Sequence, residues 1–355
     1  MDREKLNNLL LYAMKEKASS LHLSAGIAPA IRVNGFLKYT DFDKFSTLEA
    51  ETLINWFVSQ DNHLILEEKG SCDFTHSIDK RGRFRVNVYK QRGSFSITFK
   101  IGFFSVHTKE YLKLPDCVDP LCNLTSGLII ISGTSSSGRT STATYIIDQI
   151  RQTLNGHIVT IENPIEYLFK HDQSIVSQKE IGLDVTSFDD GIEAVLYQDA
   201  DVIYVSELKN ALSISKILDF AQSGKLVVAV MNTKDVLDTL QFFINISPKE
   251  STNWNRQQLA NCLRGIISQK LLPTNENTMV PAFEILLQTT AISNLLKENK
   301  ISQIPIVLEN SLGLGMTTFN TSIAQLFHSG TISKDTALNS TSNTTDMLNK
   351  LSVRR

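Results

Sequence analysis

Hydrophobic residues follow two different periodicities in the first hundred positions. Apolar residues at helical spacing predict an opening amphipathic helix: Leu6, Leu9, Leu10, Met14 and Ala18. Apolar and polar side chains alternate over 83–89 and 94–101, with Arg92-Gly93 between them, which predicts a β-hairpin with a basic polar face. Asn34-Gly35 between apolar runs predicts a further hairpin, because both residues tolerate positive φ.

The pattern changes after position 126. Short runs of Leu, Ile and Val alternate with helical stretches, which is typical of βαβ units around a buried parallel sheet. These runs cover 128–131, 158–161, 202–205 and 226–231. Beyond Trp254 the sequence predicts mostly helix, with one extended segment at 281–287 and a loosely ordered tail at 339–345.

These patterns predict an α/β protein of two domains, as its length of 355 residues also suggests. We expect a first domain at 1–102 and a second domain at 126–355. The segment 103–125 is less regular and contains Pro115 and Pro120, so we interpret it as a linker.

Composition excludes several classes of protein. Lys and Arg together number 35 and Asp and Glu 37, a net charge of −2, which argues against a nucleic-acid binder. The four cysteines lack metal-ligand spacing, so free thiols are favoured. No apolar run approaches the ~20 residues that span a bilayer, so we expect no transmembrane segment and a cytoplasmic protein.

The most informative segment lies between a predicted strand and a predicted helix. It has the spacing of a P-loop, whose backbone N–H groups and helix N-terminus cradle phosphate. We expect it to bind ATP, with Thr140 as a ligand of Mg²⁺. The nucleotide-binding candidates are Gly133, Thr134, Ser135, Ser136, Ser137, Gly138, Arg139, Thr140 and Ser141. A polar strand-to-helix turn is the alternative.

Arg139 stands where a P-loop has lysine. Arginine is a wide planar fork, whereas lysine is a compact charge on a thin stem. Because phosphoryl transfer depends on placement and charge, we expect weakened hydrolysis but retained nucleotide binding.

Polar residues follow three of the predicted strands. Glu162 at the end of 158–161 is placed to activate water, and Glu207 after 202–205 is placed to hold Mg²⁺. Each carboxylate alone could be a solvated loop residue, but their order after a P-loop favours the catalytic interpretation. Asn232 could sense the γ-phosphate or simply end a strand.

The order of these motifs resembles the type IV pilus retraction motors, the PilT/PilU-like secretion ATPases, over nearly the whole chain. The resemblance rests on residues 21–26, 31–35 and 82–87, on the aspartate-box segment 161–166, and on residues 177–182, 263–269 and 315–319. Residues 156–158, 166–167 and 330–333 are closer to the PilU branch.

The resemblance implies a PAS-like N-terminal α/β domain followed by a RecA-like P-loop NTPase core with a helical C-terminal part. It implies a cytoplasmic hexamer at the inner face of the membrane, with an inner-membrane pilus platform protein as partner. It also implies that arginines of a neighbouring first domain approach the phosphates. The matching residues are Arg83, Arg85 and Arg92, whose alternative interpretation is a solvated strand face.

Several positions depart from the family pattern. The changed positions include Arg139, Asn163, Tyr197, Lys225, Asn232 and Ser293, whereas Glu162 and Glu207 are kept. We therefore expect a motor subunit with degenerate catalytic motifs that acts with an active paralogue in a homo- or hetero-hexamer. A fully active ATPase and a non-catalytic ring component are the alternatives.

Overall fold

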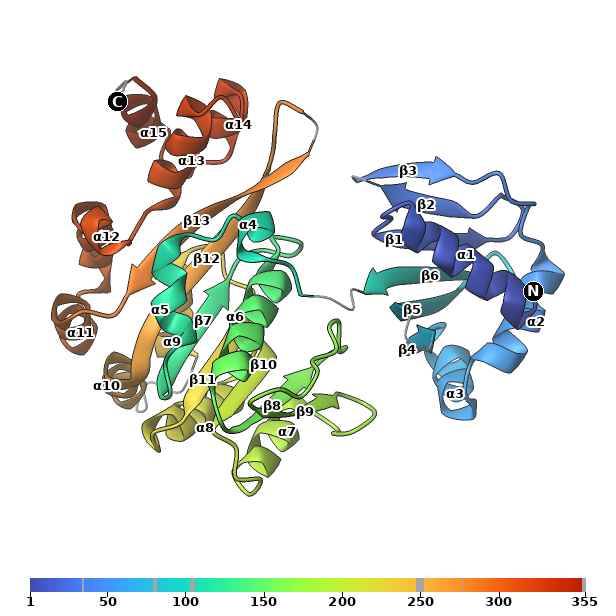
Figure 1. Ribbon diagram of the computed structural model, residues 1–355, viewed down its shortest axis with the longest axis horizontal. Coiled ribbons are helices and arrows are strands. Elements are labelled where there is room, and N and C mark those ends of the chain that lie inside the picture. The colour runs from blue at the N-terminus through green and yellow to red at the C-terminus, as the bar shows by residue number, and fades with distance from the viewer. Residues whose placement is uncertain (34, 79–81, 103–105, 247–251, 277, 353–355) are drawn as a thin grey trace. The chain divides into compact units, whose positions relative to one another are not determined.

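Two α/β units make up the chain in the computed structural model (Figure 1). Unit 1 comprises Met1–Ser105 with Glu166–Leu168, and unit 2 comprises Val106–Ile165 with Phe169–Arg355. The structure describes all residues except 34, 79–81, 103–105, 247–251, 277 and 353–355.

Unit 1 is an antiparallel sheet with strand order β3-β2-β1-β6-β5-β4, packed against helices α1 to α3. Alternate residues of β5 are buried with apolar residues of α1, as the two periodicities predict. Val33 pairs with Phe36, so β2 and β3 form the expected hairpin, although Asn34 lies outside the described residues. Its elements are α1 Arg3–Lys15, β1 Ser20–Ser24, β2 Ala30–Val33, β3 Phe36–Tyr39, α2 Thr47–Phe57, α3 Gln60–Lys69, β4 Ser71–Ile78, β5 Gly82–Gln91 and β6 Ser94–Gly102.

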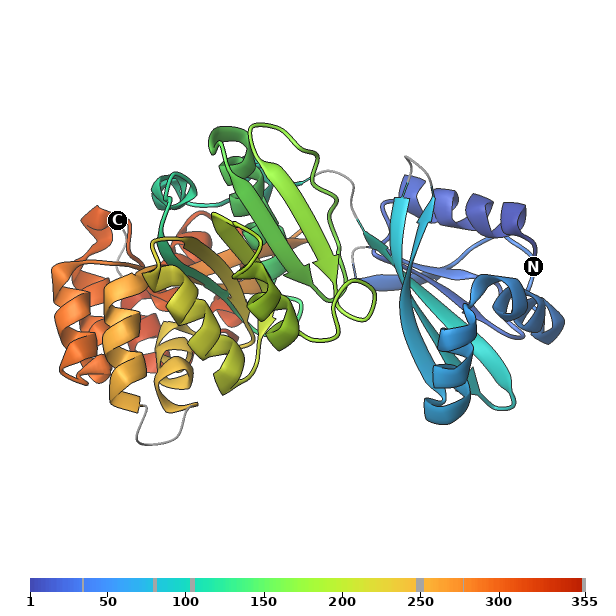
Figure 2. The same cartoon turned by 90° about the horizontal axis from the view of Figure 1, so that it is seen from below.

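Unit 2 contains a seven-stranded sheet with strand order β13-β12-β7-β11-β10-β8-β9. Neighbouring strands from β12 through β9 pair in parallel, and β13 pairs antiparallel with β12. Figures 1 and 2 show helices on both faces of this sheet. The strands are β7 Gly127–Ser132, β8 His157–Glu162, β9 Ile175–Glu180, β10 Val202–Leu208, β11 Leu226–Met231, β12 Leu263–Pro273 and β13 Met279–Leu287.

Helices cover both faces because the central strands are apolar on both sides. Leu128 and Ile130 of β7 enter one core, and Ile129 and Ile131 enter the other. The helices are α4 Lys109–Leu112, α5 Asp119–Cys122, α6 Arg139–Thr153, α7 Phe188–Val195, α8 Ala211–Gln222, α9 Val236–Asn245, α10 Thr252–Cys262, α11 Thr290–Lys297, α12 Ile304–Asn310, α13 Phe319–His328, α14 Lys334–Asn339 and α15 Thr344–Ser352, with short 3₁₀ turns at Asp116–Val118, Ile301–Gln303 and Leu312–Leu314.

The N-terminal α/β domain and the parallel-sheet core predicted from the sequence are both present. The expectation of mostly helix beyond Trp254 is wrong over 263–273, because this segment is strand β12. Its apolar residues recur at helical spacing, but β12 lies between β7 and β13 and is apolar on both faces. Periodicity alone does not distinguish such a strand from a helix.

Two further segments differ from the sequence-based expectation. Residues 109–122, expected to be a linker, form α4, a 3₁₀ turn and α5, and Leu114, Val118 and Leu121 are buried in the core beneath α6. The prolines at 115 and 120 start helical turns there. In the tail, Thr341 donates to Asn320 at 2.6 Å, and α15 buries Met347.

Candidate functional site

The P-loop joins the carboxyl end of β7 to the start of α6. Gly138 is the N-cap of α6 with φ +89°, and no side chain caps the first turn of this helix. The N-terminal N–H groups of α6 therefore lack the side-chain acceptor that most helices of this chain carry. An unsatisfied helix N-terminus with its positive dipole end suits a phosphate group.

Both P-loop glycines press against β12. A Cβ atom at Gly133 would overlap the Ser137 hydroxyl and the Gln269 carbonyl, and one at Gly138 would lie 2.7 Å from Gln269 Nε2. Gln269 is 3% exposed, and its Oε1 accepts from the Thr142 hydroxyl at 2.7 Å. Gln269 thus joins β12 to the first turns of α6 and sets the position of the loop.

A buried hydroxyl in the loop also fits a ligand. Ser137 is 3% exposed, and its Oγ has no hydrogen-bond partner among the described residues. A buried hydroxyl without a partner costs about 1–3 kcal/mol. Phosphate oxygens held by the loop would supply the missing acceptor.

Arg139 is the first residue of α6, and its side chain is bonded to the protein. Its Nη1 donates to the carbonyl oxygen of Met231 at 2.6 Å, at the end of β11. The side chain is half-buried, and this burial lowers the pKa of the guanidinium, whereas the nearby Glu207 and Tyr204 raise it. The guanidinium of Arg139, the basic group of the P-loop motif, is therefore hydrogen-bonded to the backbone at the end of β11.

The other candidates lie at the same edge of the sheet. Because β7, β11, β10 and β8 are parallel neighbours, Asn232, Glu207 and Glu162 all follow or end strands at the edge where the P-loop begins. At the usual strand spacing, Glu207 and Glu162 lie two and three strands from β7, or ~10 and ~14 Å across the sheet. A nucleotide bound on the P-loop would have to extend across the edge of the sheet to come near Glu207 and Glu162.

Glu162 is held in one orientation by its neighbours. The side chain is 1% exposed, and its Oε1 accepts from the Thr160 hydroxyl at 2.6 Å and from Gln178 Nε2 at 3.0 Å. Two fixed donors orient the carboxylate, which is what a general base requires.

Glu207 is more accessible. Its carboxylate pairs with Lys209 Nζ at 2.8 Å, and Asn232 beyond the end of β11 is exposed. No cluster of three or more His, Cys, Asp or Glu side chains suited to a metal occurs among the described residues. Thr140 and Glu207 are the candidate side chains for Mg²⁺, an ion that usually also takes phosphate oxygens and water as ligands.

The three candidate arginines belong to unit 1. Arg83 and Arg85 share the partly exposed face of β5, and Arg92 is exposed in the turn between β5 and β6. Arg85 Nε lies 3.5 Å from Asp73 Oδ1, an exposed ion pair of the kind that contributes 0–1 kcal/mol. So weak a pair leaves Arg85 available for another anion.

Two departures from the family pattern lie at the opposite edge of the unit 2 sheet. Lys225 precedes β11 and pairs with Asp201 at 2.9 Å, and Tyr197 precedes β10 and is 85% exposed. The amino ends of parallel strands lie away from the P-loop of the same chain. Tyr197 and Lys225 therefore lie away from the P-loop of their own chain.

Sequence reasoning missed three residues near the P-loop: Tyr204, Gln269 and Lys270. Tyr204 is fully buried on β10 in the core beneath α6. Gln269 and Lys270 were missed because the chain beyond Trp254 was predicted to be mostly helix, whereas both residues lie on strand β12. The signal in the sequence was that Gln269 and Lys270 interrupt an otherwise mostly apolar run, as polar residues of a functional site can do.

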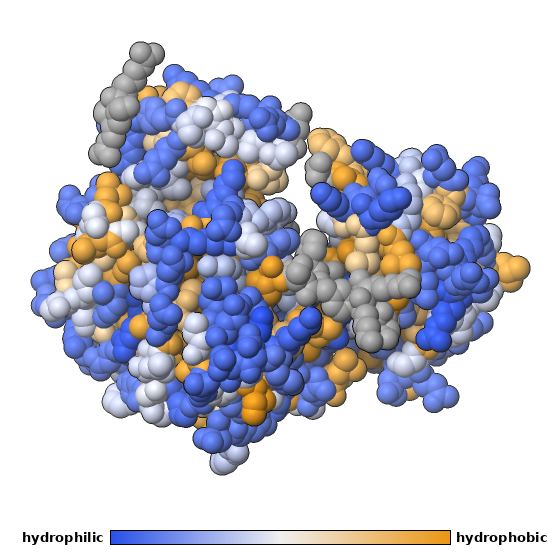
Figure 3. Space-filling view, viewed as in Figure 1, coloured by the Kyte–Doolittle hydropathy of each residue, from blue (hydrophilic) through white to orange (hydrophobic). Residues whose placement is uncertain are grey.

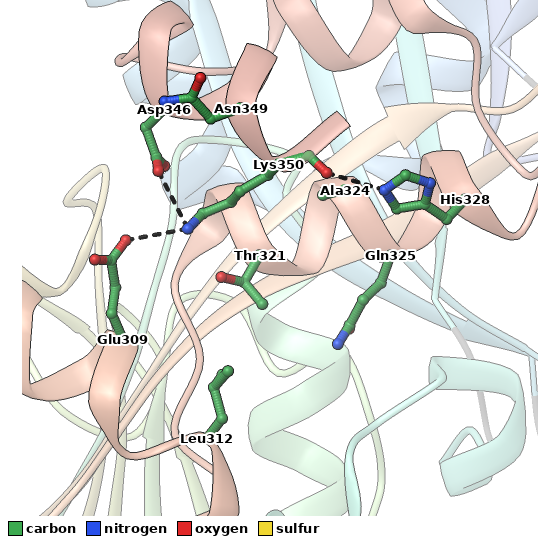
Figure 4. A pocket seen from close by; sticks show the side chains of 9 residues that line it. All are labelled: Glu309, Leu312, Thr321, Ala324, Gln325, His328, Asp346, Asn349 and Lys350. Carbon is green, nitrogen blue, oxygen red and sulfur yellow. Dashed lines mark hydrogen bonds and ion pairs between the residues drawn. The ribbon is translucent and has the colours of Figure 1, made fainter. Parts of the chain in front are cut away.

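A cavity of about 410 Å³ lies among α12, α13 and α15, away from the P-loop residues (Figure 4). Lys350 Nζ in this cavity lies 3.2 Å from Glu309 and 3.1 Å from Asp346, and its carbonyl bonds His328 Nε2 at 3.0 Å. These polar groups bond to one another and attach α15 to α12 and α13. The cavity is therefore a packing gap between three helices, and its polar groups already have partners.

Hydrophobic residues lie in separate spots among hydrophilic ones on the face shown in Figure 3. Among the described residues, every helix is too short or too polar to cross a lipid bilayer. All four cysteines are free thiols, as expected from their spacing.

Comparisons with known proteins agree with the fold. The family model described as "Type II/IV secretion system protein" matches residues 112–303. The type IV pilus retraction ATPase PilT of Pseudomonas aeruginosa is 30% identical, covering 94% of this chain and 96% of that protein. The type IV pilus ATPase PilU of the same organism is 28% identical, covering 95% and 88%. A crystal structure of the pilus retraction motor PilT with bound ADP superposes with a TM-score of 0.90 at 34% identity, covering 98% of this chain and 99% of that one.

Proposed function

Because the chain belongs to the type II/IV secretion system protein family, among the PilT/PilU-like pilus retraction motors, we propose that it is a motor subunit that binds ATP with Mg²⁺ at residues 133–141 and hydrolyses it slowly. The similar PilT structure contains ADP, which supports a nucleotide as the ligand. The uncapped start of α6 and the buried hydroxyl of Ser137 support the same ligand.

One contact carries the proposal of slow hydrolysis. The Arg139 guanidinium donates from Nη1 to the Met231 carbonyl at 2.6 Å, so it is held at the end of β11 and has only its remaining N–H groups to offer a phosphate. Glu162, held by Thr160 and Gln178, would accept a proton from the attacking water. Thr140 and Glu207 would hold Mg²⁺, which neutralises charge on the phosphates when bound. In this proposal the site still binds ATP, but Arg139 places its charge less well at the phosphates, which slows hydrolysis.

The rest of the proposal concerns assembly. The subunit acts in a cytoplasmic ring of six with an active paralogue, against an inner-membrane pilus platform protein. Arg83, Arg85 and Arg92 of one subunit contact the phosphates bound by its neighbour. The partly exposed positions of these side chains on unit 1 support this role. Light scattering of the purified protein, alone and mixed with a paralogue that has a P-loop lysine, measures the size and composition of the ring.

ATP turnover and calorimetry with Mg·ATP test the catalytic proposal. We expect saturable binding, slow turnover, a roughly tenfold faster rate in Arg139→Lys (~1.4 kcal/mol in the barrier), and no turnover in Glu162→Gln. Fast hydrolysis that Arg139→Lys leaves unchanged would indicate a fully active ATPase. Absence of any saturable binding would indicate a non-catalytic ring component.

A further inference from the structure

Lys270 lies on β12 at the level of the P-loop. Ser268 of β12 stands opposite Ser132 at the end of β7, so Lys270, two residues further on, is level with the start of the loop. It lines two cavities: one of about 240 Å³, shared with Asp235, Glu284 and Phe319, and one of about 270 Å³ that the P-loop borders. The residues that line the cavity beside the P-loop are Thr134, Ser135, Ser136, Ser137, Lys270, Leu271, Leu272, Met279 and Ser340.

The ammonium group of Lys270 lacks a carboxylate partner. Its Nζ stands 4.2 Å from the centre of the Phe319 ring, and no carboxylate among the described residues lies within ion-pair distance of it. Burial lowers the pKa of Lys270, while Glu284 and Asp235 raise it and Lys234 lowers it. A half-buried cation with only an aromatic ring beside it is a costly arrangement unless an anion joins it.

The carboxylate that raises the pKa of Lys270 most, Glu284, is engaged elsewhere. Glu284 on β13 accepts from the backbone N–H of Val236 at 2.9 Å and of Phe319 at 3.3 Å. It therefore caps the first turns of α9 and α13 instead of pairing with the lysine. Burial raises the pKa of Glu284, which further weakens it as a partner for a cation.

The two basic residues near the loop thus differ in what they contact. Arg139, in the motif, is bonded to a backbone carbonyl, whereas Lys270 has no carboxylate partner among the described residues and lines the cavity beside the loop. Ser137, which also lines this cavity, is 3% exposed, and its hydroxyl has no hydrogen-bond partner among the described residues. A donor and a cation without partners beside one helix N-terminus point to an anionic ligand.

We propose that Lys270 contacts the phosphates of the nucleotide held on the P-loop, in place of the P-loop lysine that this chain lacks. The inference rests on the proposed nucleotide site and adds a residue from a distant strand to it. The apolar side chains of Leu271 and Met279 offer the same ligand a surface for its nucleoside part.

Calorimetry on the full chain with Mg·ATP, Mg·ADP and adenosine tests this assignment. We expect Lys270→Gln to weaken ATP and ADP binding about tenfold or more and to leave adenosine binding unchanged, because only the phosphates carry charge. Lys270→Arg should stay within about threefold of the wild type. Lys334→Gln removes an exposed lysine of the same unit and should bind as the wild type does.

Thermal unfolding separates a binding role from a structural one. Lys270→Met removes an unpaired, half-buried charge, so the apo midpoint should rise while the shift caused by Mg·ATP shrinks. A lower apo midpoint together with an unchanged shift would overturn the proposal in favour of a structural lysine.

The outcomes also distinguish this inference from the function on which it rests. Wild-type binding that is lost in Thr140→Ala but kept in Lys270→Gln overturns the role of Lys270 alone. No binding by the wild type overturns both the nucleotide site and the inference.

Discussion

The contact between Gln269 and Thr142 allows a quantitative prediction about how the P-loop is supported. Both side chains are buried, and the Thr142 hydroxyl donates to Gln269 Oε1 at 2.7 Å. Gln269→Leu leaves this hydroxyl without an acceptor, and Thr142→Val leaves the amide oxygen without a donor. Each change should cost ~2 kcal/mol, within the 1–3 kcal/mol typical of an unsatisfied buried group.

The double variant distinguishes this interaction from simple loss of packing. With both partners apolar, no polar atom of the pair remains unsatisfied, so the double variant should lose ~1–2 kcal/mol rather than the ~4 kcal/mol of the two singles together. The expected coupling energy is therefore ~2–3 kcal/mol. Thr142→Ser keeps the hydroxyl and serves as the control, with a cost limited to one buried methyl group of ~1 kcal/mol.

Hydrogen-exchange mass spectrometry on peptides of α6 and β12 measures these free energies locally, which suits a chain of two units. The variants should also bind Mg·ATP more weakly, because Gln269 touches both P-loop glycines. Single-variant costs that add within ~0.5 kcal/mol would refute the reasoning, because the two side chains would then act independently.

Two other predictions concern titrating groups. A hydrogen bond from Lys5 lowers the pKa of Glu49 to about 2, despite the opposing effect of burial. This depressed carboxylate stabilises the fold above pH ~4.5 and loses its effect as the pH falls towards 2. Urea unfolding should therefore show a deficit in Glu49→Gln that is largest near pH 6 and shrinks towards pH 2.5; a constant deficit would contradict this. Burial raises the pKa of the Cys122 thiol to about 12, so iodoacetamide at pH 8 should modify it only in urea, and equal labelling of the native protein would show an accessible thiolate.

Much of the fold follows from local patterns. The strands at 128–131, 158–161, 202–205 and 226–231 were predicted from short apolar runs, and all four lie in the parallel sheet. Strand β12 was missed because polar residues such as Arg264, Ser268 and Gln269 interrupt its apolar run and leave the apolar residues at helical spacing. The segment 103–125 was interpreted as a linker because proline was taken as a boundary, whereas Pro115 and Pro120 begin helical turns.

In the candidate site, too, some features can be read from local sequence and others depend on the fold. The P-loop spacing, the arginine at position 139 and the acidic residues 162 and 207 can be read from the sequence, because each belongs to a strand and the turn that follows it. The positions of Tyr197 and Lys225 relative to the loop could not be read in this way. Which end of a strand a residue occupies decides whether it lies near the loop, and both residues lie at the amino ends.

The sequence by itself determined a loop of two glycines and hydroxyl side chains between an apolar strand and a helix, with arginine in place of lysine. These are local properties of backbone conformation and side-chain chemistry. Only the tertiary structure placed β12 beside β7, which brings Gln269 under the loop and Lys270 to its level across more than a hundred positions of sequence. The tertiary structure also places the Arg139 guanidinium within hydrogen-bond distance of the Met231 carbonyl. Strand order decides these contacts, and it arises from the burial of whole strands rather than from any short pattern along the chain.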